Sequence, residues 1–212
     1  MRKFIISIDA GTTSNRSILF DLKGKPVFSS QKEFTQYFPK SGWVEHNPEE
    51  IWRTTVKTLK DVIQKAKKLR GEILNIGITN QRETTVLWDK RTGKPVYNAI
   101  VWQDRRQEEF CAKLRKQNKD TMIFNKTGLL IDSYFSGTKI KWILDNVPKA
   151  KKLMNDNQLL FGTIDSFLIW RFTKGKVHAT DATNASRTMI YNITSNRWDD
   201  TILKLLKIKK NI

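Results

Sequence analysis

Near its N-terminal end the chain reads Phe4-Ile5-Ile6-Ser7-Ile8-Asp9-Ala10-Gly11-Thr12-Thr13-Ser14-Asn15-Arg16-Ser17-Ile18-Leu19-Phe20-Asp21. Two short apolar runs, residues 4–8 and 17–21, flank a turn of small and polar residues, which is the pattern of two tightly joined strands. A further strand-like run, residues 26–32, follows the turn Lys23-Gly24-Lys25. Successive strands with such short connections predict an antiparallel meander.

After the meander the apolar period becomes helical. Asn47-Pro48-Glu49-Glu50 predicts a helix start, with an N-cap residue, a proline in the first turn and an acidic residue that closes a capping box. Apolar residues recur at helical spacing from Ile51 to Leu69, and residues 74–79 predict another buried strand. Further strands are expected at 84–88 and 98–102, and helices at 105–118, 139–146, 166–172 and from 201 onward. This mixture predicts an α/β fold, with a single domain over residues 1–212 whose mixed sheet is flanked by helices.

Composition excludes several classes of protein. The chain has a net charge of +18, one cysteine (Cys111) and no apolar run long enough to span a membrane. A lone cysteine cannot form an internal disulfide, which favours a reducing compartment, so we expect a cytoplasmic protein without a membrane partner. The lysines are dispersed among helical patterns, and no nucleic-acid-binding signature accompanies them. We therefore interpret the charge as solvated helix faces rather than as a nucleic-acid interface.

The turn between the first two strands has the chemistry of a phosphate-binding loop. Gly11 leaves the backbone open to close approach, and residues 12–14 all carry hydroxyl groups. Asp9, at the end of a strand, is placed to hold Mg²⁺ directly or through water, and Arg16 can balance phosphate charge. No Gly-Lys-Ser/Thr follows, which excludes a Walker A loop. From these residues alone, a polar hairpin with satisfied hydroxyls stays an alternative.

Three later segments, the third of which begins at Tyr134, have the chemistry of a polyol pocket. Asn80-Gln81-Arg82-Glu83-Thr84 sets an arginine beside a carboxylate, and Ile100-Val101-Trp102-Gln103-Asp104-Arg105-Arg106 sets an indole beside a polar rim. Arg82 can donate to a hydroxyl, Glu83 can accept from one, and Trp102 can wall the C–H face, while Tyr134 can donate or accept at the mouth of a helix. Taken singly, these residues are better explained as a surface ion pair, a core indole and a capped helix start.

Together, the wording and order of these motifs resemble the FGGY carbohydrate kinases, and within them the members that phosphorylate glycerol. The similar segments are residues 9–14, 80–84, 100–106, 127–146, 160–173 and 177–189. The resemblance implies an actin-like ATPase or ribonuclease H-like fold and ATP-dependent phosphorylation of glycerol at its 3-hydroxyl, with ATP and Mg²⁺ as cofactors. It assigns the nucleotide phosphates to Thr12, Thr13, Ser14 and Arg16, the magnesium environment to Asp9, and glycerol to Arg82, Glu83, Trp102 and Tyr134.

The family's catalytic base is an aspartate in a Gly-Asp-Gln-like segment, and no such segment occurs in these 212 residues. The resemblance therefore implies the N-terminal part of a kinase whose base lies beyond Ile212, so we expect no activity from the chain alone. Two alternatives stay open. In the first, the chain is one subunit of a split kinase, joined by a separately encoded C-terminal half or by copies of itself. In the second, it is a non-catalytic protein that binds partners through its basic surface.

Overall fold

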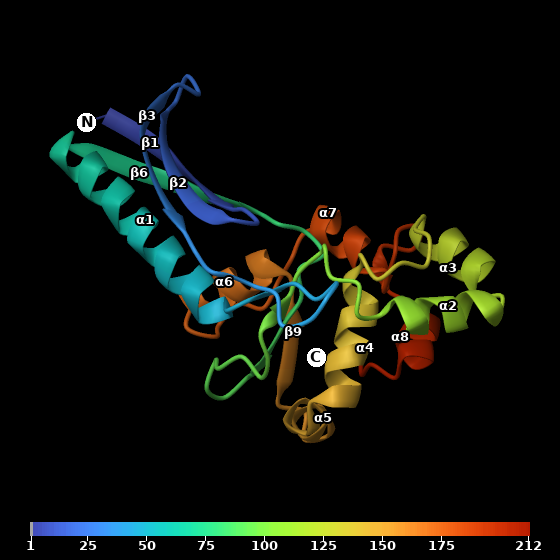
Figure 1. The fold of residues 1–212 in the computed structure, drawn as a ribbon. Helices are drawn as coiled ribbons and strands as arrows, with labels where there is room; N and C mark the ends of the chain where they lie inside the picture. Colours follow the sequence, from blue (N-terminus) through green and yellow to red (C-terminus); the bar gives the residue numbers. More distant parts are fainter. Residues whose placement is uncertain (1) are drawn as a thin grey trace. The chain divides into compact units, whose positions relative to one another are not determined.

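The computed structural model describes residues 2–212 (Figure 1) and divides into two compact units. Unit 1 comprises residues up to Gln36 and the segment His46–Gln81, and unit 2 comprises Tyr37–Glu45 and Arg82–Ile212. Within the described residues, no helix is both long and apolar enough to cross a membrane. The predicted phosphate turn belongs to unit 1, and the predicted polyol residues belong to unit 2.

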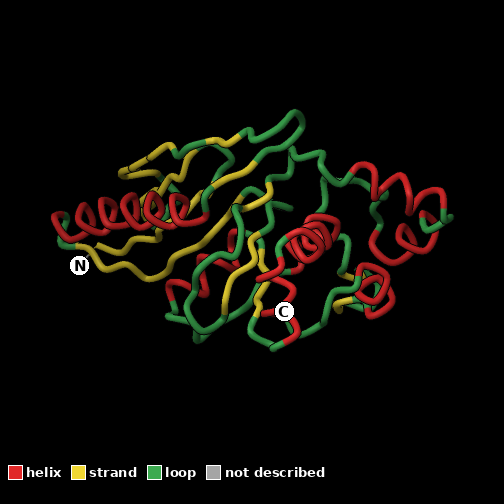
Figure 2. Tube along the Cα trace, turned by 60° about the horizontal axis from the view of Figure 1, so that its bottom comes forward, coloured by secondary structure: helices red, strands yellow, loops and turns green. Residues whose placement is uncertain are grey.

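Unit 1 is a sheet with one long helix along it (Figure 2). The sheet has the strand order β3-β2-β1-β6. β1 (Arg2–Ala10), β2 (Ser14–Asp21) and β3 (Pro26–Glu33) pair antiparallel in succession, which confirms the predicted meander. The chain then passes through α1 (Pro48–Lys68) and returns as β6 (Gly71–Asn80), parallel to β1. The sheet is therefore mixed, as predicted.

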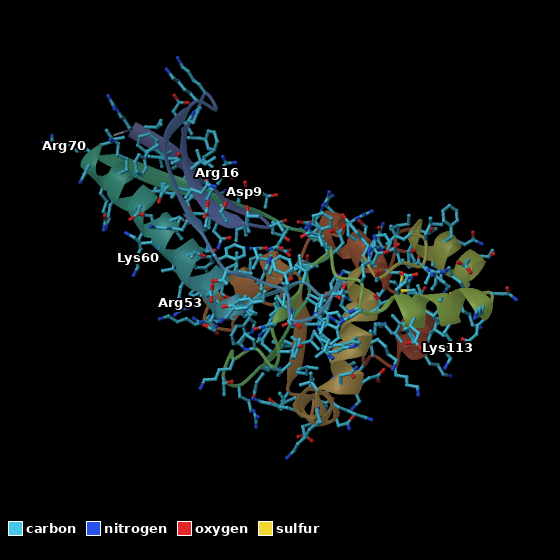
Figure 3. The ribbon with its side chains drawn as sticks, in the orientation of Figure 1. Asp9, Arg16, Arg53, Lys60, Arg70 and Lys113 are labelled. Carbon is cyan, nitrogen blue, oxygen red and sulfur yellow. The ribbon has the colours of Figure 1, made fainter. Side chains whose placement is uncertain are left out.

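The long helix α1 begins where the sequence predicts. Asn47 is the N-cap, and its Oδ1 accepts a hydrogen bond of 2.9 Å from the N–H of Glu49, while Pro48 opens the first turn. One face of α1 packs on β1, β2 and β3. The core between helix and sheet consists of fully or nearly fully buried side chains: Ile6, Ile8, Leu19, Ile51, Leu59, Val62 and Ala66. On the other side, Arg53 and Lys60 extend away from the sheet (Figure 3). The hydrophobic face thus holds the helix, since each buried aliphatic side chain contributes about 1.5–3 kcal/mol.

The strand predicted as buried at residues 74–79 is an edge strand. β6 pairs with β1 alone, and Leu74 and Ile76 are 46% and 43% exposed. The strand is present, but the expectation of burial was wrong. An apolar run shows that a strand forms without showing whether a second strand or a layer covers it.

Unit 2 packs helices around short strands. Its strands are β7 (Val86–Asp89), β8 (Ala99–Ile100), β9 (Leu159–Gly162), β10 (Tyr191–Asn192) and β11 (Arg197–Trp198), while β4 (Gln36–Tyr37) and β5 (Glu45–His46) lie where the chain passes between the units. Its helices are α2 (Glu108–Lys116), α3 (Asp120–Thr127), α4 (Ser136–Asn146), α5 (Pro148–Asn155), α6 (Ile164–Phe172), α7 (Ala182–Ala185), the 3-10 turn η1 (Ser186–Thr188) and α8 (Asp200–Leu206). β7 and β9 pair antiparallel. The helices predicted near 105–118, 139–146, 166–172 and 201 are present, whereas α3, α5 and β9 were not predicted.

Helix α4 runs through the core of unit 2. Its Ile140 and Ile143 are fully buried and belong to a cluster that includes Ile123 of α3, Ala150 of α5 and Ile202 of α8. The same cluster contains side chains from β7 and β9. The N-terminal end of α4, where Tyr134 lies just before the helix, is therefore held by a well-packed element.

A buried ion-pair cluster ties two segments of unit 2 together. The fully buried Arg106 side chain places Nη2 at 2.7 Å from Asp104 Oδ2 and 2.8 Å from Glu45 Oε1. Its guanidinium lies 3.8 Å from the ring centroid of Trp43 and 4.6 Å from that of Trp142. The interpretation of Asp104 and Arg106 as a polar pocket rim was wrong. These charges lie in the interior because a carboxylate and two indoles far away in the sequence complete their environment.

Candidate functional site

In unit 1, a tight turn joins β1 to β2. The Gly11 N–H donates to Ser14 O at 3.0 Å, and a Cβ at Gly11 would lie 3.1 Å from that same oxygen. A side chain at this position would crowd the turn, so its tightness favours glycine. The turn is also tied to β3, since Gln31 Nε2 donates to Ser14 Oγ at 2.7 Å. The predicted hydroxyls of residues 12–14 thus follow the glycine on a backbone that the flanking strands hold.

The residue predicted to hold Mg²⁺, Asp9, and the residue predicted to balance phosphate charge, Arg16, lie opposite each other on the paired strands β1 and β2. Asp9 and Arg16 are register partners, and Arg16 Nη2 lies 3.2 Å from Asp9 Oδ2 (Figure 3). Both side chains are partly exposed, at 37% and 46%. The described residues contain no cluster of three or more potential metal ligands. A single carboxylate beside the predicted phosphate turn nevertheless suits Mg²⁺, which usually keeps several waters and takes its other ligands from substrate phosphates.

In unit 2, Glu83 is held in an unusual backbone conformation. Its φ is 65°, in the left-handed region that costs roughly 1–2 kcal/mol for a residue with a Cβ. Its carbonyl oxygen accepts hydrogen bonds from Thr85 Oγ1 at 3.1 Å and from Ser136 Oγ at 3.0 Å. Its buried carboxylate accepts from Arg187 Nε at 2.6 Å. The surrounding contacts therefore maintain a backbone turn that places this carboxylate.

The other predicted polyol residues form an aromatic corner. The rings of Trp102 and Tyr134 are both half-buried, with centroids 5.5 Å apart and planes at 59°. Arg187 reaches the same corner, with Cζ 5.7 Å from the Tyr134 ring centroid. Glu83, Trp102 and Tyr134 are thus connected through direct contacts and through Arg187. Arg82 is exposed and adjoins Glu83 in the chain.

Arg187 and Lys139 are two residues of this region to which sequence reasoning assigned no role. Lys139 of α4 is fully buried, and its Nζ donates to the main-chain oxygen of Tyr134 and, at 3.4 Å, to that of Glu83. Burial lowers the pKa of Lys139 to about 7, although the carboxylate of Glu83 and other nearby acids oppose that shift. A signal was available, since Lys139 is a charged residue four positions before the apolar Ile143, which places both on one face of the helix. Arg187 offered no such signal, because its partner is remote in sequence.

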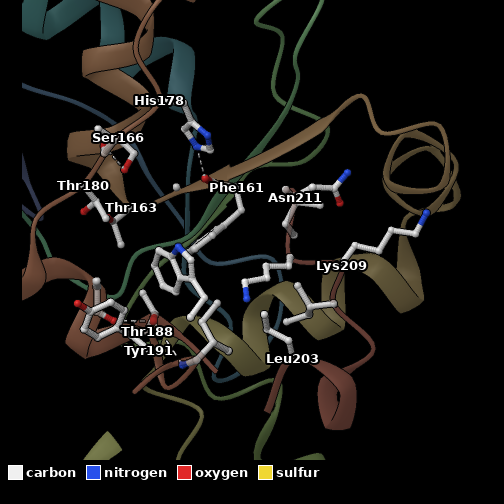
Figure 4. Close-up of a pocket in the computed structure, with 18 of the residues that line it drawn as sticks. Phe161, Thr163, Ser166, His178, Thr180, Thr188, Tyr191, Leu203, Lys209 and Asn211 are labelled. Atoms are coloured by element: carbon white, nitrogen blue, oxygen red, sulfur yellow. Dashed lines mark hydrogen bonds between the residues drawn. The ribbon is translucent and has the colours of Figure 1, made fainter. Parts of the chain in front are cut away.

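A separate cavity of about 430 Å³ lies in unit 2. Thr163, Ser166, His178 and Thr180 are among its lining residues (Figure 4). His178 Nε2 donates to the carbonyl oxygen of Phe161 at 2.7 Å, so this ring is already engaged by the backbone. None of the predicted site residues lines the cavity. Its size by itself assigns it no role.

Comparison with known proteins identifies relatives over the whole chain. A model of the N-terminal domain of the FGGY family of carbohydrate kinases matches residues 4–212. The glycerol kinase of Malacoplasma penetrans is 59% identical over 211 residues, which cover 100% of this chain and 42% of that protein. The glycerol kinase of Brachyspira hyodysenteriae is 60% identical over 208 residues, which cover 98% and 42%. The chain thus spans about two fifths of the length of these relatives.

Solved structures agree on the fold. The crystal structure of Plasmodium falciparum glycerol kinase with ADP matches with a TM-score of 0.92 at 38% identity, over 97% of this chain and 41% of that one. A ligand-bound xylulose kinase from Lactobacillus acidophilus matches with a TM-score of 0.85 at 28% identity, over 99% and 41%. The predicted α/β fold of the actin-like ATPase type is confirmed. The chain belongs to the FGGY family of carbohydrate kinases, as that family's N-terminal domain.

Proposed function

We propose that this chain supplies the polyol-binding side chains and the first phosphate turn of a kinase that transfers a phosphoryl group from ATP to glycerol, giving sn-glycerol 3-phosphate. The observation that carries the proposal is the corner formed by Glu83, Trp102 and Tyr134. The 59–60% identity to glycerol kinases supports glycerol as the polyol. A buried carboxylate, a phenol and an indole face match a small molecule with hydroxyls on one side and C–H groups on the other.

The proposed roles follow from the chemistry of each group. Glu83 accepts a hydrogen bond from a glycerol hydroxyl, and Arg82 donates one. Trp102 packs against the carbon chain, and Tyr134 bonds a hydroxyl. A pocket that hydrogen-bonds each hydroxyl binds less tightly any molecule that leaves these pocket groups without a partner. This difference in binding would favour glycerol over small molecules that lack its hydroxyls.

The phosphate turn has the complementary role in the proposal. Thr12, Thr13 and Ser14 donate to nucleotide phosphates, and Arg16 balances their charge. Asp9 would hold Mg²⁺ through water and phosphate oxygens, and the ion would neutralise charge on the transferred phosphoryl group. The similar glycerol kinase of Plasmodium falciparum was crystallised with ADP, which supports nucleotide use by the family.

Glycerol binding by the chain tests this proposal directly. Titrating glycerol into the ¹⁵N-labelled chain is expected to shift the indole N–H resonance of Trp102 and the amide resonances of Glu83 and Tyr134. We expect a dissociation constant of roughly millimolar or weaker, because an open pocket leaves much of the ligand in water. Trp102→Ala is expected to abolish the shifts at Glu83 and Tyr134.

A matched control exists in the same unit. Tyr191 and Trp198 form another tyrosine–tryptophan pair, with centroids 5.4 Å apart, and Trp198 is not assigned to glycerol. Trp198→Ala should leave the glycerol shifts intact. Shifts scattered away from Trp102 and Tyr134, or the absence of any shift at saturating glycerol, would contradict the polyol assignment.

A second expectation concerns turnover. Phosphoryl transfer needs a residue that orients or deprotonates the attacking hydroxyl, and these 212 residues contain no Gly-Asp-Gln segment of the family type. We therefore propose that the base comes from another polypeptide segment, and we expect no glycerol-dependent ADP release from the purified chain in a coupled assay. Turnover at a rate typical of kinases, about 1–100 s⁻¹, would show that a residue of this chain acts as the base.

A further inference from the structure

The carbonyl oxygens of the phosphate turn are held by two glutamine side chains of unit 1. Gln81 Nε2 donates to Gly11 O at 3.0 Å, and Gln36 Nε2 donates to Thr12 O at 3.1 Å. The Gln81 N–H also donates to Ala10 O at 2.8 Å. Two successive carbonyl oxygens of the turn therefore each accept a hydrogen bond from a separate side-chain amide.

His46 joins these glutamines. Its Nε2 lies 2.6 Å from Gln36 Oε1, and its Nδ1 lies 3.3 Å from Gln81 Nε2. The ring is fully buried and packs edge-on against Phe34, with centroids 5.0 Å apart. The contacts form a continuous path from Thr12 O through Gln36, His46 and Gln81 to Gly11 O.

Hydrogen-bond polarity along this path determines the histidine tautomer. Each glutamine faces a main-chain oxygen, which can only accept, so each must present its NH₂ group there. Gln36 then presents its oxygen to His46 Nε2, which must carry the proton. Gln81 uses its NH₂ group toward His46 Nδ1, which must accept. The neutral imidazole protonated at Nε2 satisfies all of these bonds at once.

The charge state of the ring agrees with this geometry. Burial lowers the pKa of His46 to about 4, and the nearby carboxylate of Glu50 opposes that shift only in part. The ring is therefore neutral at physiological pH, with one donor and one acceptor. A protonated ring would direct two N–H donors at the glutamines, and one of them would meet the Gln81 NH₂ group.

The hydrogen bonds to these carbonyl oxygens orient the main-chain N–H groups of the turn. In a planar trans peptide the C=O and the following N–H point in opposite directions. Holding Gly11 O toward Gln81 therefore points the Thr12 N–H away from Gln81, and holding Thr12 O toward Gln36 points the Thr13 N–H away from Gln36. Both carbonyls are held by side chains that His46 connects, so the two following N–H groups point away from that connected group. Successive main-chain N–H groups that point to one side can form an anion-binding concavity.

We infer that Gln36, His46 and Gln81 form a positioning triad that fixes two successive peptide groups of the turn so that their N–H groups face bound phosphate. The inference rests on the proposed role of the turn, and it assigns these three residues to orientation rather than to contact with the nucleotide.

The tautomer of His46 in the natural chain is the first test, and it needs no variant. Long-range ¹H–¹⁵N correlation of the imidazole nitrogens is expected to show a proton on Nε2 and a lone pair on Nδ1 at neutral pH. The reverse tautomer, or a ring that exchanges between both, would overturn the triad. His178 is the other histidine of the chain, and it gives an internal reference.

The second test uses variants that remove the amide without adding charge. Gln81→Met and Gln36→Met are each expected to weaken binding of magnesium tripolyphosphate about tenfold, followed through the amide resonances of Thr12 and Thr13. That change corresponds to about 1.4 kcal/mol. Gln64→Met on the exposed side of α1 is the matched control and should leave the affinity unchanged.

Hydrogen exchange separates positioning from general stability. With magnesium tripolyphosphate bound, the amides of Thr12 and Thr13 should exchange faster in Gln81→Met than in the natural chain, while those of Ile6 and Ile8 in β1 should keep their natural rates. Unchanged affinity and unchanged Thr12 and Thr13 resonances in both folded glutamine variants would overturn the inference. If Gln81→Met fails to fold, the half-buried Gln36 and the tautomer measurement still decide.

The failure of the proposed phosphate role would look different. Magnesium tripolyphosphate would then leave residues 11–14 of the natural chain unperturbed. The tautomer of His46, and the Thr12 and Thr13 amide resonances of the two glutamine variants compared with those of the natural chain, would still report whether the triad orients the turn.

Discussion

Replacing Arg106 with leucine is expected to lower the free energy of unfolding by about 3–5 kcal/mol. The guanidinium is fully buried and bonds the buried carboxylates of Asp104 and Glu45. Leucine would leave both carboxylates without a cation in the interior, and the stacking against Trp43 would be lost. Urea unfolding followed by tryptophan fluorescence and by circular dichroism measures the change.

The neighbouring arginine provides the control. Arg105 is 58% exposed, and its Nη1 lies 3.0 Å from Asp132 Oδ1, which is itself partly exposed. Arg105→Leu should cost no more than about 1 kcal/mol, because solvent screens such pairs. Adding Asp104→Asn to Arg106→Leu should recover part of the loss, since one uncompensated carboxylate disappears. Equal effects of Arg105→Leu and Arg106→Leu would show that the buried cluster contributes no special stability.

Local patterns in the sequence predicted much of unit 1. The meander of β1–β3 follows from alternating apolar runs separated by short turns, and the start of α1 follows from Asn47 and Pro48. Each of these features depends on residues close together in the chain. The exposure of β6 could not be predicted in this way, because it depends on which neighbours the strand acquires after folding.

The candidate site divides along the same line. The residue types at Glu83, Trp102 and Tyr134 pointed to polyol chemistry, and the structure brings these side chains into one corner. Their supports could not be predicted, because the pair between Glu83 and Arg187 spans 104 positions. The positive φ of Glu83 was equally hidden, since nothing in a glutamate indicates a left-handed backbone. Short-range patterns thus suggest the chemistry of a site, whereas its geometry depends on long-range contacts.

The other large expected effect concerns the pH dependence of stability. Lys139 is fully buried, and the carboxylates of Glu83, Asp104 and Asp132 lie close enough to stabilise its charge, as does the thiol of Cys111 when ionised. Burial outweighs these groups and lowers the pKa of Lys139 from 10.5 to about 7. The unfolded chain therefore holds a proton on this lysine between pH 7 and 10.5 that the folded chain releases.

The direction of the effect follows from that difference. Stability rises with pH wherever the unfolded state binds more protons, so the contribution of Lys139 is fully present above pH 10.5 and is lost as the pH falls through 7. Between pH 7 and pH 9 the natural chain is expected to gain about 2 kcal/mol from this group. Lys139→Met has no titrating group there, so its stability relative to the natural chain should fall by that amount over the same range.

Comparing the two chains at each pH cancels the other titrating groups. Lys141→Met on the same helix is the control, because Lys141 pairs with the exposed Asp145, and it should follow the natural pH profile. Parallel profiles for Lys139→Met and the natural chain would mean that the buried amine titrates alike in both states. Because Lys139 also holds the carbonyls of Glu83 and Tyr134, its variant should weaken glycerol binding while Lys141→Met does not. If the stability profile of Lys139→Met changes while its glycerol binding equals that of the natural chain, Lys139 contributes to stability alone. Ser136 and Arg187 would then be the residues that orient the pocket.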